Sequence, residues 1–152
     1  MRDSVAVQGE AAEVALGEAQ AVLAMVQDEE RRGRLADLVA AVGEGELGAD
    51  EQAALEDLLV LGLQTGRIRA LYGPGGETAA LGVYRRLPQG RELGESARGV
   101  SDALGSLAGK TLDGISVQAV GPGAFVLSLT VEGMELSVRL DRSGARLGSV
   151  GL

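Results

Sequence analysis

The chain has 152 residues and a formal net charge of -8, from 14 basic and 22 acidic side chains. It contains no cysteine and no histidine, which excludes disulfide bonds, zinc fingers, thiol nucleophiles and imidazole bases. An acidic surface repels phosphate backbones and anionic lipid headgroups, so we expect neither nucleic acid nor membrane as a partner. Hydrophobic residues make up 45% of the chain, which is enough for a folded core.

The composition also indicates an origin and a compartment. Arginine is abundant, lysine occurs once and asparagine is missing, a bias typical of a high-GC bacterial genome. The first residues lack the apolar segment of a signal peptide, and no apolar run reaches the length of a membrane span. We therefore expect a cytoplasmic protein.

Residues 9–43 are predicted to be helical, because apolar side chains recur at spacings of three and four and no proline intervenes. The charged segment 28–34 either forms a turn between two helices or lies on the solvated face of one long helix, and Gly33 favours the turn. Residues 1–47 carry 4 basic and 10 acidic side chains, so we expect a separate acidic helical arm that binds a partner. The residues expected to make this contact are Val22, Val26, Leu35, Leu38 and Val42.

A second domain is predicted over residues 48–152. Its first helix should begin after the candidate N-cap Asp50 and end at Gly66 or run on to residue 72, before a glycine-proline breaker. Residues 77–87 fit a helix or a strand, and their alanines favour a helix. Residues 91–109 show the clearest amphipathic helical spacing in the chain.

From residue 113 the apolar period changes from 3.6 to 2, and short turns separate four alternating segments. This pattern predicts a four-stranded antiparallel meander over 113–152 with one apolar and one polar face. An apolar sheet face must be covered, so we predict an α+β fold in which an N-terminal helical region, of two to four helices, packs on the meander. If residues 77–87 formed a strand, the element order would resemble that of the cystatin-like and NTF2-like rolls.

Catalytic motifs are missing from the sequence. The string Gly105–Thr111 lacks the first glycine of a phosphate-binding loop, and it follows a predicted helix where that motif requires a strand. Neighbouring carboxylates fall in helices rich in exposed charge, and no patterned calcium loop is present. We therefore expect no catalytic residues, no metal site and no cofactor.

A group of arginines stands close together in the sequence, at Arg67, Arg69, Arg85 and Arg86. If folding brings them onto one face, they form a basic patch that docks the acidic N-terminal helices of the same chain or of a neighbour. Scattered surface arginine in an arginine-rich genome explains the group equally well, because charge patterning does not place residues in space.

These observations favour a non-enzymatic protein-interaction or assembly module. It would bind a partner protein or itself, as a homo-oligomer, through the helical arm and the edge of the sheet. The alternative is a small-molecule-binding roll with an apolar pocket between helix and sheet. The lining residues expected for that pocket are Tyr84, Phe125, Leu127 and Leu136.

Overall fold

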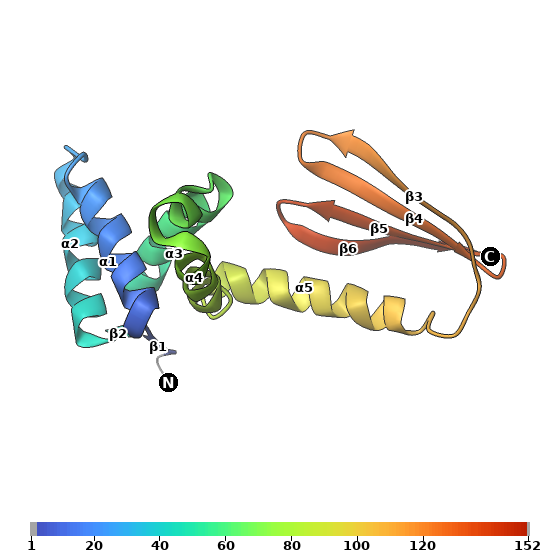
Figure 1. Cartoon of the computed structure of the whole chain (residues 1–152), viewed down its shortest axis with the longest axis horizontal. Helices are drawn as coiled ribbons and strands as arrows, with labels where there is room; N and C mark the ends of the chain where they lie inside the picture. Colours follow the sequence, from blue (N-terminus) through green and yellow to red (C-terminus); the bar gives the residue numbers. More distant parts are fainter. Residues whose placement is uncertain (1–2, 152) are drawn as a thin grey trace. The chain divides into compact units, whose positions relative to one another are not determined.

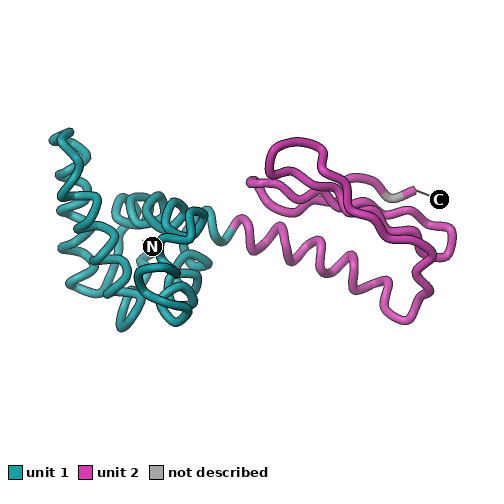
Figure 2. The backbone as a smooth tube through the Cα atoms, turned by 45° about the horizontal axis from the view of Figure 1, so that its top comes forward, with its two compact units in different colours: residues 1–91 teal, residues 92–152 magenta. Residues whose placement is uncertain are grey.

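The computed structural model describes residues 3–151 and divides the chain into two compact units, 1–91 and 92–152 (Figure 2). The division falls after Arg91, whereas the change in charge had suggested a boundary near residue 47. The physical reason is that the acidic helices share one core with the helices that follow them, up to Leu87. Charge composition therefore does not mark the boundary between the units.

Unit 1 is a helical bundle that begins with a small two-stranded ribbon. The ribbon pairs β1 (Val5–Ala6) with β2 (Glu46–Leu47). The first helix packs against each of the other three. The four helices are α1 (Gly9–Leu23), α2 (Glu29–Glu44), α3 (Ala49–Gln64) and α4 (Arg67–Tyr84) (Figure 1).

The region 9–43 thus forms two helices, and the turn between them lies at residues 24–28, ahead of Gly33. Asp28 fixes this boundary, because its carboxylate accepts a hydrogen bond of 2.9 Å from the backbone N–H of Arg31. Gly66 ends the predicted second helix: its φ of 74° is left-handed, and α4 begins at the next residue. Residues 77–84 are helical, as their alanines indicated.

Unit 2 contains the α+β arrangement that the sequence predicted. Helix α5 (Pro88–Gly105) runs from the end of unit 1 into unit 2 and precedes a four-stranded antiparallel sheet in the order β3-β4-β5-β6 (Figure 1). The hairpin between β4 and β5 turns at Glu132 and Gly133, which both have positive φ angles, as a tight two-residue turn requires. The strands are β3 (Leu112–Gly121), β4 (Ala124–Val131), β5 (Met134–Asp141) and β6 (Gly144–Gly151).

The α+β class and the four-stranded meander are therefore confirmed. Five helices precede the sheet, four of them in unit 1. Among residues 3–151, no helix has the length and apolar character needed to cross a membrane.

Candidate interaction surface

The sheet of unit 2 has one apolar and one polar face, and its register shows which residues share a face. Residues paired across antiparallel strands point to the same side. One row of paired residues crosses the sheet as Val117, Leu127, Val138 and Leu147. The neighbouring row on the opposite face contains four serines, Ser116, Ser128, Ser137 and Ser149.

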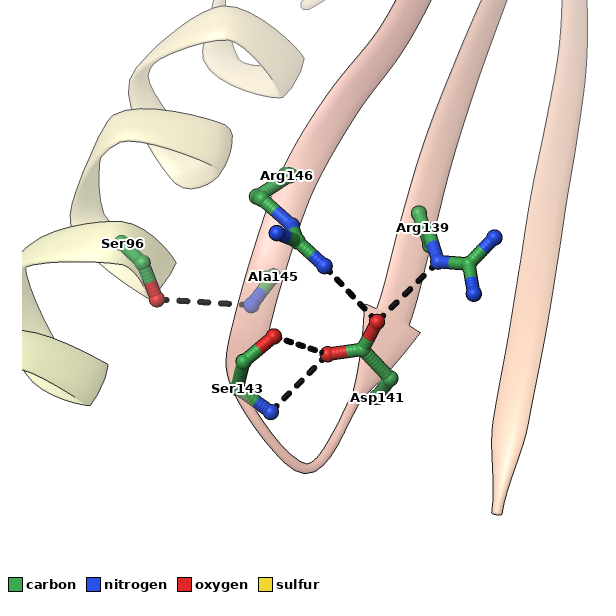
Figure 3. Close-up of polar contacts among 6 residues, drawn as sticks. All are labelled: Ser96, Arg139, Asp141, Ser143, Ala145 and Arg146. Carbon is green, nitrogen blue, oxygen red and sulfur yellow. Dashed lines mark hydrogen bonds and ion pairs between the residues drawn. The ribbon is translucent and has the colours of Figure 1, made fainter. Parts of the chain in front are cut away.

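Helix α5 covers the middle of the apolar face. Leu129, Val131 and Leu136 are buried in a small core to which Leu104 and Leu107 contribute. Near the middle of α5, the hydroxyl of Ser96 accepts a hydrogen bond of 3.3 Å from the backbone N–H of Ala145 (Figure 3). The helix is thus held to the sheet near its middle, through Ser96, and at its C-terminal end, through Leu104.

The helix does not cover the β3 side of the same face. An α-helix with its side chains is about 10 Å wide, whereas four strands spaced about 4.8 Å apart make a wider surface. Every residue of β3 is exposed, including the large apolar ones. The uncovered side chains that we call the β3–β4 strip, with their exposed fractions, are Leu112 (49%), Ile115 (61%), Val117 (65%) and Phe125 (44%).

Two further properties distinguish this side of the sheet. Strand β3 lies at the end of the strand order, so its outer edge has no partner within the sheet. Residues 114–131, which include most of β3 and all of β4, contain no charged side chain. Strands β5 and β6 do carry charges, among them Glu135, Arg139 and Arg146. On β3 and β4, the uncovered Ile115, Val117 and Phe125 thus lie within this uncharged stretch, whereas the exposed apolar residues Leu140 and Leu147 of the same face lie on strands that carry charges.

The far end of the sheet is organised by Asp141. Its Oδ1 accepts hydrogen bonds from the backbone N–H (2.9 Å) and the hydroxyl (2.5 Å) of Ser143, and its Oδ2 accepts from Arg139 (3.0 Å) and Arg146 (2.8 Å) (Figure 3). Its partners are thus on its own strand, in the turn and on β6. This cluster holds the β5–β6 turn and leaves no free carboxylate for chemistry.

The residues predicted for the helical arm lie in the core of unit 1. Leu35, Leu38 and Val42 are no more than 5% exposed, and Val22 and Val26 pack against the same core. Their helical spacing corresponds to an apolar stripe that is buried by the other elements of unit 1. In the described structure, these side chains are therefore not accessible to a binding partner.

The four arginines of the proposed basic patch are all in unit 1 but do not act alike. The Nε of Arg67 donates to both carboxylate oxygens of Glu18 on α1, at 3.2 and 3.1 Å, and Arg69 pairs with Glu77 at 3.7 Å. Arg85 and Arg86 follow the end of α4, where Arg86 donates to its own helix. One arginine of the group thus joins α4 to an acidic N-terminal helix of its own chain.

The pair between Arg67 and Glu18 belongs to a buried cluster that the sequence analysis missed. Glu18 is 3% exposed, and the hydroxyl of Tyr72 reaches it from α4. Burial raises the pKa of Tyr72, the neighbouring Glu18 carboxylate raises this pKa further, and Arg67 opposes the shift. The sequence signal that could have indicated this cluster is Glu18, a single acidic residue within an apolar stretch of α1.

The residues proposed to line a pocket are divided between the units. Tyr84 packs against the core of unit 1, whereas Phe125, Leu127 and Leu136 belong to the sheet of unit 2. Burial raises the pKa of Tyr84, and the nearby Glu56 adds to the shift. Within unit 2, Leu136 is core and Phe125 is surface. The structure thus does not unite the four in one cavity within a unit.

A groove of about 740 Å³ does lie in unit 1, between α2 and α3. Its walls carry acids and arginines of opposite charge, including Asp37, Asp57 and Arg31, together with Leu35 and Leu58. Within residues 3–151, no three acidic side chains come together in an arrangement that would hold a metal ion. The groove, as far as the described residues show, therefore contains no such set of metal ligands.

No family model, no curated protein and no solved structure matches this chain. In the described residues, the β3–β4 strip combines exposed apolar side chains with a run of 18 residues, 114–131, that carries no charge. The 18-residue run without charge was readable in the sequence, but the side of the sheet that α5 leaves uncovered was not.

Proposed function

We propose that this chain is a non-enzymatic protein-interaction module that acts in the cytoplasm without a cofactor, and that its binding surface is the β3–β4 strip. The observation that carries the proposal is the exposure of Leu112, Ile115, Val117 and Phe125 together on one sheet face. Single exposed apolar residues are ordinary, but contiguous patches mark interaction sites.

The energetics favour a protein partner for this strip. Full burial of a large apolar side chain contributes about 1.5–3 kcal/mol, and about half of that contribution is still unused at each residue of the strip. Small-molecule sites enclose most of their ligand, whereas the side chains of the strip are roughly half exposed on a sheet face. The free edge of β3 adds main-chain donors and acceptors that a partner strand can pair.

Site-specific photo-crosslinking tests the proposal. A photoreactive amino acid replaces Val117, on the strip, in cells of the source organism. The matched control places it at Ser116, the next residue on β3, which is exposed and points to the opposite face. We expect a discrete protein adduct from position 117 and none from position 116. Equal labelling at the two positions, or no adduct at either, would contradict the proposed function.

A further inference from the structure

We propose that the partner of the β3–β4 strip is the same strip of a second copy of this chain, packed sheet face against sheet face. This inference rests on the proposed function and names the occupant of that surface. A two-fold axis would bring Ile115, Val117 and Phe125 of one copy against the same residues of the other. Each copy would then bury the apolar half-face that α5 leaves open.

The distribution of charge permits a second copy to bind at the strip. Each chain carries a formal net charge of -8, so two copies repel each other over most of their surfaces. Residues 114–131 contain no charge, so a contact made through these residues buries no like-charged pair, and Asp113 is the charged residue that precedes them on β3. A partner recognised by charge would find no charge on the strip to pair with. A second copy presents a surface that is equally apolar and equally neutral.

The layer arrangement of unit 2 accommodates this contact. Leu104 of α5, and Leu107 in the turn that follows it, pack on the apolar face against Leu129 and its neighbours. Stacked sheets lie about 10 Å apart, so the sheet of a second copy would continue the layer that α5 begins. The two adjacent rows of the half-face start with Ile115 paired to Leu129 and Val117 paired to Leu127. They present side chains from two neighbouring strands to the copy.

Packing through the face accounts for the exposed residues better than pairing through the edge. If two β3 strands paired edge to edge, main-chain hydrogen bonds would form, but Phe125 on β4 would stay one strand away from the junction and exposed. Each strip side chain exposes roughly 100 Å². With the surrounding backbone, two copies would remove on the order of 1,000 Å² from solvent, which is the size of a weak, concentration-dependent interface.

The absence of cysteine from the natural chain permits a direct test. Four single-cysteine variants of the full chain are purified and treated with a short thiol crosslinker. Two are on the strip, Val117→Cys and Phe125→Cys. Two matched variants are exposed on the opposite face of β3, Ser116→Cys and Gln118→Cys. We expect covalent dimers from both strip variants and at least tenfold less from the two controls.

Two results would overturn the inference. Dimers from Val117→Cys and Ser116→Cys without dimers from Phe125→Cys would show edge pairing in place of face packing. Folded variants that give no dimer at any position would exclude a second copy on the strip. If no position gives a dimer, the photo-crosslinking experiment tests whether the proposed function still holds. An adduct with a different protein at position 117 would preserve it, and no adduct would remove it.

Discussion

At the scale of single residues, Asp141 determines how the last hairpin of the sheet closes. The hydroxyl and backbone N–H of Ser143 and the guanidinium groups of Arg139 and Arg146 hold the pKa of this carboxyl well below its ordinary value. The side-chain hydrogen bond from Ser143 is the largest cause. A lowered folded-state pKa means that the ionised carboxylate stabilises the fold above the ordinary pKa of about 3.9.

We therefore expect Asp141→Asn to lower the melting temperature of unit 2 at neutral pH. The difference between wild type and variant should shrink as the pH falls below about 4, because the wild-type carboxylate then loses its advantage over the unfolded chain. Thermal unfolding followed by circular dichroism over a pH series measures this. A difference that stays constant down to the lowest pH would show that the charge of Asp141 plays no part.

Glycine positions in the helices give a second prediction at this scale. A Cβ at Gly62 would lie 2.6 Å from Cδ1 and 2.7 Å from Cγ1 of Ile68, which is fully buried, so Gly62→Ala should destabilise unit 1. Gly33, inside α2, has no atom within 4 Å of the same position, so Gly33→Ala should stabilise by about 0.5–1 kcal/mol. Chemical denaturation of the two variants compares them. Effects of the same sign would contradict the packing described for α3 and α4.

At the scale of elements, the buried stripes of the helices hold unit 1 together. Leu38 of α2 is fully buried, and truncation to alanine should cost about 2–5 kcal/mol through lost burial and the cavity left behind. Leu61 of α3 is 58% exposed, and Leu61→Ala should change stability by less than about 1 kcal/mol. Urea unfolding measures both. Comparable losses would mean that α2 is not part of the core.

The strands were the elements most predictable from the sequence. A strict period of two over residues 113–152, interrupted by Gly121–Gly123 and Glu132–Gly133, defines strand direction, face and turn without long-range information. The observed meander follows this pattern. For the end of α3 the sequence left two alternatives, Gly66 or residue 72, and the helix ends at Gln64, just before the left-handed Gly66. The turn between α1 and α2 was harder, because Asp28 acts through its capping hydrogen bond and the sequence drew attention to Gly33 instead.

The candidate site was less predictable, for a physical reason. Periodicity identifies the apolar stripe of α2, at Leu35, Leu38 and Val42, but it does not tell which element covers the stripe. In unit 1 the neighbouring helices cover it, so these residues are core and not a binding arm. For β3 the opposite holds: Ile115 and Val117 read as buried strand residues, and they are exposed because one helix is narrower than four strands.

At the scale of the whole molecule, the two units differ in how completely they bury their apolar residues. Unit 1 has an extended core that involves all four of its helices and the β1–β2 ribbon. Unit 2 has one helix on a sheet and leaves the β3–β4 strip open. A net charge of -8 keeps most of the surface in water, and the uncharged strip is where another protein surface is accommodated at the lowest electrostatic cost.

The absolute mass of the full chain in solution, by light scattering after size exclusion, tests the central claim most directly. We expect twice the chain mass of 15.5 kDa for the wild type, and a single chain mass for Val117→Glu, which places a charge in the strip. Gln118→Glu, with the same charge on the opposite face, should retain the dimer mass. A wild-type chain that stays at 15.5 kDa at every concentration, or a Val117→Glu variant with unchanged dimer mass, would contradict self-association through the β3–β4 strip.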